Sequence, residues 1–222
     1  MRPRICASVP VHNTESALDL IGQLDGDVDL VELRLDYSGG NVDVRRLRDA
    51  TDLPIIATNR LASEGGLWRG AERERIGLLS SALDVGVDYV DVELSADVAW
   101  LVRKAADGGA KVIASRHYSA CVPGVGEMES LLRDASVLGA SLLKVVGTAG
   151  CYAESLVCLD FLRAHPGNVC FAMGTHGVPS RVLSPLVGGA FTYASAHEGE
   201  EVAQGQLTVT RMRKIYSLMG VE

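Results

Sequence analysis

The 222-residue sequence lacks the patterns that mark several large protein classes. It has no apolar run near the roughly 18 residues that a membrane-spanning helix needs, so we expect no membrane span. Its five cysteines form no C-x-x-C pair, which argues against a disulfide framework and against structural zinc. Lysine and arginine number 21 against 28 acidic residues, and the formal charge of −7 disfavours non-specific binding to nucleic acid or to an anionic membrane.

Signals for export and for dinucleotide binding are also missing. The residues before the first apolar stretch, Ile5–Val9, are too few for a secretory signal peptide. No G-x-G-x-x-G sequence follows that stretch, so an open, doubly wound sheet is the weaker of two fold hypotheses. We therefore expect a cytoplasmic protein with reduced thiols.

Short β-branched runs alternate with longer amphipathic stretches along the whole chain. Strands are predicted at Ile5–Val9, Leu30–Leu35, Ile55–Thr58, Tyr89–Leu94, Lys111–Ser115, Leu142–Val146, Asn168–Met173 and Phe191–Ala194. Helices are predicted at Thr14–Leu24, Val42–Ala50, Ala71–Val85, Ala96–Asp107, Met128–Leu138, Tyr152–Ala164, Ser180–Val187 and Thr208–Leu218. Strands that are apolar on both faces are typical of a parallel sheet covered by helices. Eight such units predict a single (β/α)8 barrel, the TIM barrel, as one domain over residues 1–222.

Polar residues occur where the predicted strands should be apolar. Active sites of β/α barrels lie at the carboxyl ends of the strands, so polar residues there are candidates for chemistry. The candidates are Glu32, Arg34, Arg60, Glu64, Asp91, Glu93, His117, Lys144 and Arg181.

Lys144 is the most informative of these residues because its neighbours on both sides are aliphatic. Burial and nearby guanidinium groups both disfavour an ammonium ion, and Arg34, Arg60 and Arg181 could supply that repulsion. A lysine with a lowered pKa is partly free amine and can form a Schiff base with a carbonyl carbon. The alternative is a structural lysine, ion-paired with a buried carboxylate such as Glu32.

His117 is the candidate proton carrier, since an imidazole gives and takes protons near neutral pH. Glu64, in a Glu-Gly-Gly sequence, could orient that imidazole. The other histidines are expected in loops or at helix ends. No histidine pair has metal-ligand spacing and the carboxylates are not clustered, so we expect neither a metal nor a cofactor.

In the types and order of these residues, the sequence resembles the type I 3-dehydroquinate dehydratases. The resemblance rests on three motifs and two single residues. The motifs are E-L-R-x-D at 32–36, R-x-x-x-E-G-G at 60–66 and M-G-x-x-G-x-x-S-R at 173–181, and His117 and Lys144 lie between them in the family's order. Further matches are Ile5-Cys6-Ala7-Ser8, Asp91-Val92-Glu93-Leu94 and Gly205-Gln206.

The resemblance implies that the protein dehydrates 3-dehydroquinate to 3-dehydroshikimate, the third step of the shikimate pathway to chorismate and the aromatic amino acids. It implies a Schiff base on Lys144, a syn elimination in which His117 acts first as base and then as acid, and Glu64 supporting the imidazole. It assigns substrate contacts to Ser8, Glu32, Arg34, Arg60, Met173, Arg181 and Gln206, with Arg181 holding the carboxylate. It also implies a homodimer.

Two stretches depart from the family pattern. Tyr118-Ser119 follow the histidine in place of Asp-Phe. In the closing segment, Val202 and Gln204 replace a serine and a proline that usually precede Gly205-Gln206. The acidic, glycine-containing stretch from Ala196 to Gln206 is predicted to be a mobile lid over the substrate.

Two rival hypotheses remain open at this stage. A class I aldolase would also use a barrel lysine, with glycine-rich loops at 174–177 and 188–189 holding a phosphate. A barrel that binds a small acid without turnover would contain the same arginines and would form no covalent adduct at Lys144.

Overall fold

The computed structural model describes residues 2–24 and 26–221 and contains the predicted alternation of strands and helices. Met1 and Glu222, the ends of the predicted domain, and Asp25 lie outside the described residues. The strands are β1 (Ile5–Pro10), β2 (Leu30–Arg34), β3 (Ile55–Thr58), β4 (Tyr89–Glu93), β5 (Lys111–His117), β6 (Leu142–Thr148), β7 (Val169–Met173) and β8 (Thr192–Ser195). The helices are α1 (Thr14–Gly22), α2 (Val44–Asp49), α3 (Glu72–Asp84), α4 (Ala99–Asp107), α5 (Val125–Leu138), α6 (Tyr152–Ala164), α7 (Val178–Leu183) and α8 (Val209–Met219).

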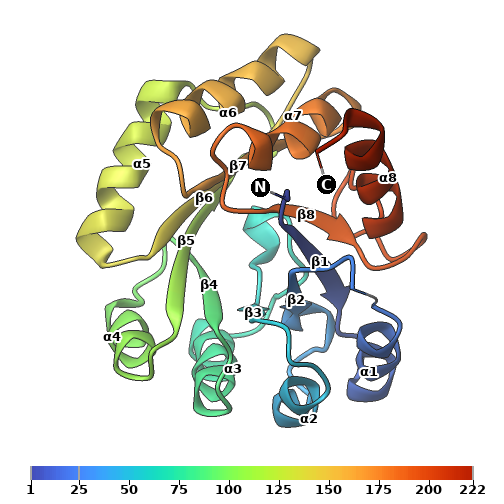
Figure 1. Cartoon of the computed structure of the whole chain (residues 1–222). Helices are drawn as coiled ribbons and strands as arrows, with labels where there is room; N and C mark the ends of the chain where they lie inside the picture. The colour runs from blue at the N-terminus through green and yellow to red at the C-terminus, as the bar shows by residue number, and fades with distance from the viewer. Residues whose placement is uncertain (1, 25, 222) are drawn as a thin grey trace.

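The strands form one parallel sheet in the order β7-β6-β5-β4-β3-β2-β1-β8. The helices surround this sheet, which curls into a nearly closed (β/α)8 barrel (Figure 1). Its two end strands meet through a backbone hydrogen bond from Ala190 N to Asn168 O of 2.9 Å, just before β8 and β7 begin. The barrel prediction is therefore confirmed, and the doubly wound alternative is wrong.

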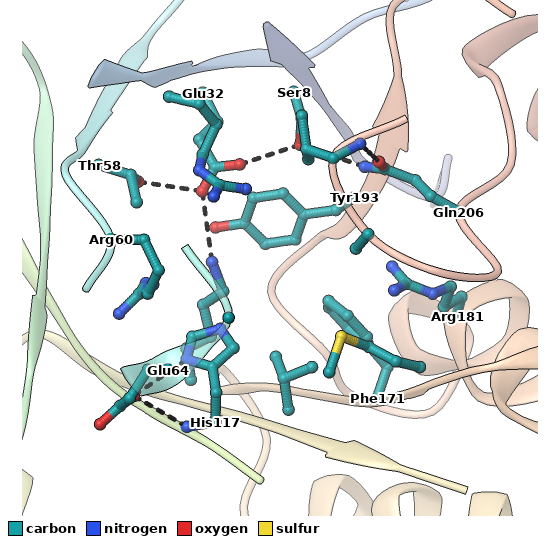
Figure 2. A pocket seen from close by; sticks show the side chains of 17 residues that line it. Ser8, Glu32, Thr58, Arg60, Glu64, His117, Phe171, Arg181, Tyr193 and Gln206 are labelled. Atoms are coloured by element: carbon teal, nitrogen blue, oxygen red, sulfur yellow. Dashed lines mark hydrogen bonds and ion pairs between the residues drawn. The ribbon is translucent and has the colours of Figure 1, made fainter. Parts of the chain in front are cut away.

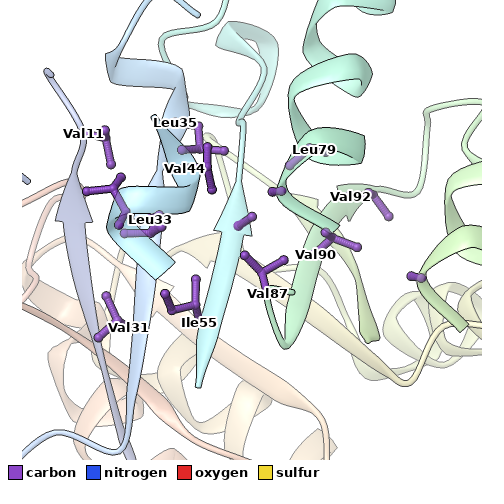
Figure 3. Close-up of a cluster of buried hydrophobic side chains, with 14 of the residues drawn as sticks. Val11, Val31, Leu33, Leu35, Val44, Ile55, Leu79, Val87, Val90 and Val92 are labelled. Carbon is purple, nitrogen blue, oxygen red and sulfur yellow. The ribbon is translucent and has the colours of Figure 1, made fainter. Parts of the chain in front are cut away.

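Side chains alternate between the two faces of each strand, and β2 shows the consequence. Val31 and Leu33 pack outward in a cluster beneath the helices of the first half of the chain (Figure 3). Leu30 faces inward and packs in the barrel interior, while Glu32 and Arg34 face the same interior nearer the carboxyl end.

The interior is thus divided along the barrel axis. Its amino-terminal part is apolar and its carboxyl-terminal part is polar. The apolar part is made by Cys6, Leu30, Ile56, Ile113, Val169 and Phe191, while Val146, Phe171 and Tyr193 of the same cluster reach the cavity nearer the carboxyl end. This apolar floor fixes how deep a ligand entering from the carboxyl end can go.

Two strands extend further than predicted. β5 runs to His117 and β6 runs to Thr148, and each ends two residues past its predicted end. Register pairs Ser115 with Lys144 and His117 with Val146. Because alternate residues share a face, His117 projects into the barrel one pleat nearer the carboxyl end than Lys144.

Within the described residues, no helix is long and apolar enough to cross a membrane.

Candidate active site

A cavity of about 510 Å³, counted with the space that opens to solvent, lies at the carboxyl end of the barrel (Figure 2). All ten predicted site residues line it. They are Ser8, Glu32, Arg34, Arg60, Glu64, His117, Lys144, Met173, Arg181 and Gln206. Thr58, Gly65, Val146, Phe171, Tyr193, Val202 and Ala203 complete the lining.

Lys144 is only 5% exposed and its ammonium group contacts two carboxylates. Nζ lies 3.0 Å from Asp91 Oδ2 and 3.3 Å from Glu32 Oε1. It also lies 4.1 Å from the ring centre of Tyr193. The expectation of an amine surrounded by guanidinium groups is therefore wrong for this structure, because carboxylates are the nearest charges.

Two of the three arginines that were expected to repel Lys144, Arg34 and Arg60, are paired with carboxylates of their own. Arg60 donates to Asp91 Oδ1 at 2.6 Å and to Glu93 Oε1 at 2.9 Å. Arg34 forms a two-bond pair with Asp36, at 2.8 and 2.9 Å. Ion pairing explains how these guanidinium groups tolerate burial, and it limits their repulsion of the amine.

The charge network continues outward to helix α3. Arg75, which is fully buried, donates to Glu93 Oε2 at 2.6 Å and to Asn59 O at 2.9 Å. Its other nitrogens pair with Glu72 at the surface, at 2.7 Å. A continuous chain of paired charges thus links α3 to Lys144, and it fixes the carboxylates before any ligand binds.

His117 is held by Glu64. Glu64 Oε2 lies 3.2 Å from His117 Nδ1 and accepts the His117 backbone N–H at 3.0 Å. Burial, and then the charges of Arg60 and Lys144, hold the pKa of His117 well below its ordinary value. The imidazole is accordingly neutral near pH 7 and able to accept a proton.

The Glu-Gly-Gly sequence places the Glu64 carboxylate. Glu64 ends a single 3-10 turn that Gly65 closes in the left-handed region, at φ 80°. A side chain at Gly66 would overlap the backbone carbonyl of Arg60. Burial raises the pKa of Glu64, although Arg60 and Arg116, whose Nη1 donates to Glu64 Oε1 at 3.2 Å, oppose that shift.

Arg181, from α7, differs from the other arginines of the pocket. It is 1% exposed, yet its Nε and Nη2 find no hydrogen-bond acceptor anywhere in residues 2–24 and 26–221. Its guanidinium carbon lies 4.5 Å from the ring centre of Phe171. Burial lowers the pKa of Arg181 to about 10, still far above neutral pH, so a cation with free donors lines the cavity. Such a group is suited to an anion.

The segment between β8 and α8 covers one side of the cavity. Gln206 Nε2 donates to Ser8 Oγ at 3.2 Å, and Ser8 Oγ donates to Glu32 Oε2 at 2.9 Å. Gly205, at φ 74°, crosses the end of β7, where an added Cβ would lie 2.5 Å from Gly174 O. The segment therefore reaches the polar residues through a contact between two glycine backbones.

Reasoning from sequence missed two functional-site groups. Asp91 was noticed in its strand but was not assigned to the site, and its contact with Lys144 depends on strand register. Tyr193 lies in an apolar run and had the pattern of an ordinary core aromatic. No local signal marks it, because its position follows from the pairing of Cys6 with Tyr193 between β1 and β8.

Comparison with known proteins identifies the family. A model of the type I 3-dehydroquinase family matches residues 5–222. The chain belongs to the type I 3-dehydroquinase family. A 3-dehydroquinate dehydratase from Dehalococcoides mccartyi is 36% identical over 86% of this chain and 86% of its own length. One from Methanosarcina barkeri is 35% identical over 86% of this chain and 85% of its own length.

Solved structures of this family have the same fold. The 3-dehydroquinate dehydratase of Geobacillus kaustophilus superposes with a TM-score of 0.89 at 25% identity, over 99% of this chain and 92% of its own. The type I enzyme of Clostridium difficile gives 0.86 at 25% identity, over 98% and 92%. As a type I 3-dehydroquinase the chain is a 3-dehydroquinate dehydratase, a hydro-lyase, and the aldolase hypothesis is set aside.

Proposed function

We propose that the cavity converts 3-dehydroquinate to 3-dehydroshikimate through a Schiff base on Lys144, as the third step of the shikimate pathway. The observation that carries this proposal is a lysine amine, 5% exposed, at a ligand-sized cavity that a neutral imidazole also lines. The Clostridium difficile structure contains covalent modified comenic acid. A small acid in covalent form in a related barrel supports a nucleophile in this one.

The reaction begins when Lys144 passes one proton of its ammonium group to the neutral imidazole of His117, while its nitrogen stays beside Asp91 and Glu32. The free amine attacks the ring ketone and a C–N bond forms. The ketone oxygen then receives this proton and a second one from the nitrogen, both by way of His117, and departs as water. The resulting protonated imine withdraws electrons from the adjacent carbon, which makes a proton on that carbon acidic. Asp91 and Glu32, 3.0 and 3.3 Å from the nitrogen, stabilise the imine's positive charge.

His117 then moves the proton. Its neutral imidazole removes the proton next to the imine, and the enamine that forms expels the β-hydroxyl. The imidazolium returns the proton to that oxygen, which leaves as water, and hydrolysis of the imine frees the product and Lys144. One histidine serves both steps because a syn elimination removes both groups from the same ring face.

Arg181 binds the substrate carboxylate. Its planar fork of donors matches a carboxylate, and its position over Phe171 leaves those donors facing the cavity. Substrate hydroxyls contact Glu32, Arg34 and Arg60 across the cavity, with further polar contacts from Ser8 and Gln206. Met173 packs against the ring. A substrate held by Arg181 at its carboxylate and by the other residues at its hydroxyls has its ketone at Lys144.

Trapping with borohydride tests the covalent step. Incubation with 3-dehydroquinate and borohydride should reduce the imine and add ligand mass to the peptide that contains Lys144. The His117→Ala variant should lose turnover by roughly 10²–10⁴-fold, the usual contribution of a general acid–base residue, and should still form the adduct slowly. An unmodified Lys144 peptide in the parent would instead favour a barrel that binds a small acid without covalent chemistry.

We also propose a cytoplasmic homodimer that takes a small-molecule substrate. The five cysteines are all free thiols, as expected in a reducing compartment. The dimer rests on resemblance to the family, and the mass of the protein in solution tests it.

A further inference from the structure

Tyr193, from β8, has a buried hydroxyl that the fold does not use. The residue is 3% exposed, and its Oη finds no hydrogen-bond partner within the part of the chain that the structure describes. A buried hydroxyl without a partner destabilises the folded protein, because it has lost its hydrogen bonds to water and gained none. Phenylalanine would fill the same space without that cost, so the hydroxyl is unexplained by folding alone.

The ring of Tyr193 covers Lys144. Nζ lies 4.1 Å from the ring centre, within the range of a cation–π contact. Lys144 therefore forms its bond to substrate directly against this ring. The keto carbon becomes bonded to Nζ, and the oxygen on that carbon is one bond further away.

The hydroxyl end of Tyr193 points toward the side of the cavity where Glu32 and Arg60 lie, and away from Arg181 (Figure 2). Burial raises the pKa of this phenol well above its ordinary value, and the charges of Glu32 and Asp91, the carboxylates that hold Lys144, raise it further. A phenol with a raised pKa keeps its proton and can donate a hydrogen bond throughout the reaction.

We propose that the Tyr193 hydroxyl donates a hydrogen bond to the oxygen on the carbon that Lys144 attacks. When the amine adds, the electron pair of the C=O bond moves to this oxygen, and a fixed donor stabilises the developing charge. The phenol retains its proton, and the oxygen takes its protons from the imidazole before it leaves as water. Tyr193 is thus a catalytic residue for imine formation, an inference that rests on the proposed function of Lys144.

The Tyr193→Phe variant tests this role, because it removes one oxygen atom and little else. The rate of Lys144 adduct formation with 3-dehydroquinate and borohydride should fall about tenfold, the factor expected for one hydrogen bond to a developing charge. The melting temperature should stay unchanged or rise, because the free protein loses no hydrogen bond. If the hydroxyl served only to stabilise the fold, the variant would form adduct at the parent rate and its melting temperature would fall.

Tyr89→Phe is the matched control. Tyr89, from β4, lies at the amino end of the same barrel, packs against its apolar floor and is absent from the cavity lining. It should form adduct at the parent rate.

Each outcome decides the proposal. Slower adduct formation by Tyr193→Phe with an intact melting temperature supports it. Equal rates for Tyr193→Phe and the parent overturn it while leaving the Schiff base in place, and so does a lower melting temperature for that variant. If the parent itself forms no adduct, the proposed function fails first and the role of Tyr193 fails with it.

Discussion

Buried polar groups are paired with one another on one wall of the cavity and lack partners on the other. On the β2–β6 wall, Glu32, Arg60 and Lys144 line the cavity and Asp91 and Glu93 bind them from behind, and every one of these charged groups pairs with another at 2.6–3.3 Å. On the β7–β8 wall, made by Phe171, Arg181 and Tyr193, the buried donors have no partner among the described residues. The first wall is complete before a ligand arrives, and the second needs one.

This difference separates stability from binding. Ion pairs in the β2–β6 wall fix the geometry around Lys144, and removing one partner leaves a buried charge uncompensated. Donors in the β7–β8 wall lower the stability of the free protein and, under the proposed function, gain their partners from the substrate. Substitutions in the β2–β6 wall should therefore lower the free energy of unfolding, and substitutions in the β7–β8 wall should weaken substrate binding.

The largest effect is expected from Arg60→Met. Loss of the Arg60 guanidinium group removes one cation from the buried carboxylates of Asp91 and Glu93. The free energy of unfolding should fall by about 3–5 kcal/mol, as it does when other buried ion pairs are broken. Denaturant unfolding of the free protein measures this. The control is Arg46→Met, which breaks an exposed pair with Glu15 and should change little. Equal stability of Arg60→Met and the parent would mean that this network contributes nothing to the fold.

A smaller effect, of the other kind, is expected from Arg181→Met. KM for 3-dehydroquinate should rise roughly 10- to 100-fold, since hydrogen bonds to a charged group contribute about 1.5–3 kcal/mol. The free energy of unfolding should not fall, because a methionine buries no charge. Arg181→Lys keeps the charge without the fork and should bind more weakly than the parent. A drop in stability without a change in KM would place Arg181 with the structural charges.

The smallest effect concerns pH. Burial and neighbouring cations depress the pKa of His117. We therefore expect kcat/KM to stay constant as the pH falls below about 6.5, the ordinary pKa of a histidine side chain. The unfolded chain binds this proton more readily than the folded one, so stability falls as pH falls through that range, by at most about 1.4 kcal/mol per pH unit. His117→Asn should lose less stability on acidification. An acid limb above pH 6.5 would contradict the neutral imidazole.

The positions of the site residues could be predicted from the sequence, and their partners could not. Lys144 stood out as a charged residue inside an apolar strand, and His117 as a titratable residue just past the predicted end of another, both toward the carboxyl end of the barrel. The ring of guanidinium groups around the amine was wrong because Arg34 pairs with Asp36, two residues along its own chain, and Arg60 with Asp91 on the next strand. The Arg60–Asp91 pairing depends on the register between β3 and β4, which no local pattern carries.

Strand ends show the same limit. β5 was expected to stop at Ser115, because Arg116 and His117 are polar, yet hydrogen bonding to β6 continues to His117. Polarity predicted the end of the apolar interior rather than the end of the strand. Tyr193 is the opposite case, since an aromatic in an apolar run gives no sign that its hydroxyl lacks a partner in the described structure.

The crossing of Gly205 over Gly174 has a mechanical consequence. Gly174 N donates to Gln204 O at 3.1 Å, so the segment that carries Gln206 and the strand end that carries Met173 are tied at one point by backbone alone. If substrate binding moves Gln206, as its proposed contact allows, this hydrogen bond should carry the movement to the end of β7. At this crossing Gly205 admits nothing larger than hydrogen, because an added Cβ would lie 2.5 Å from Gly174 O.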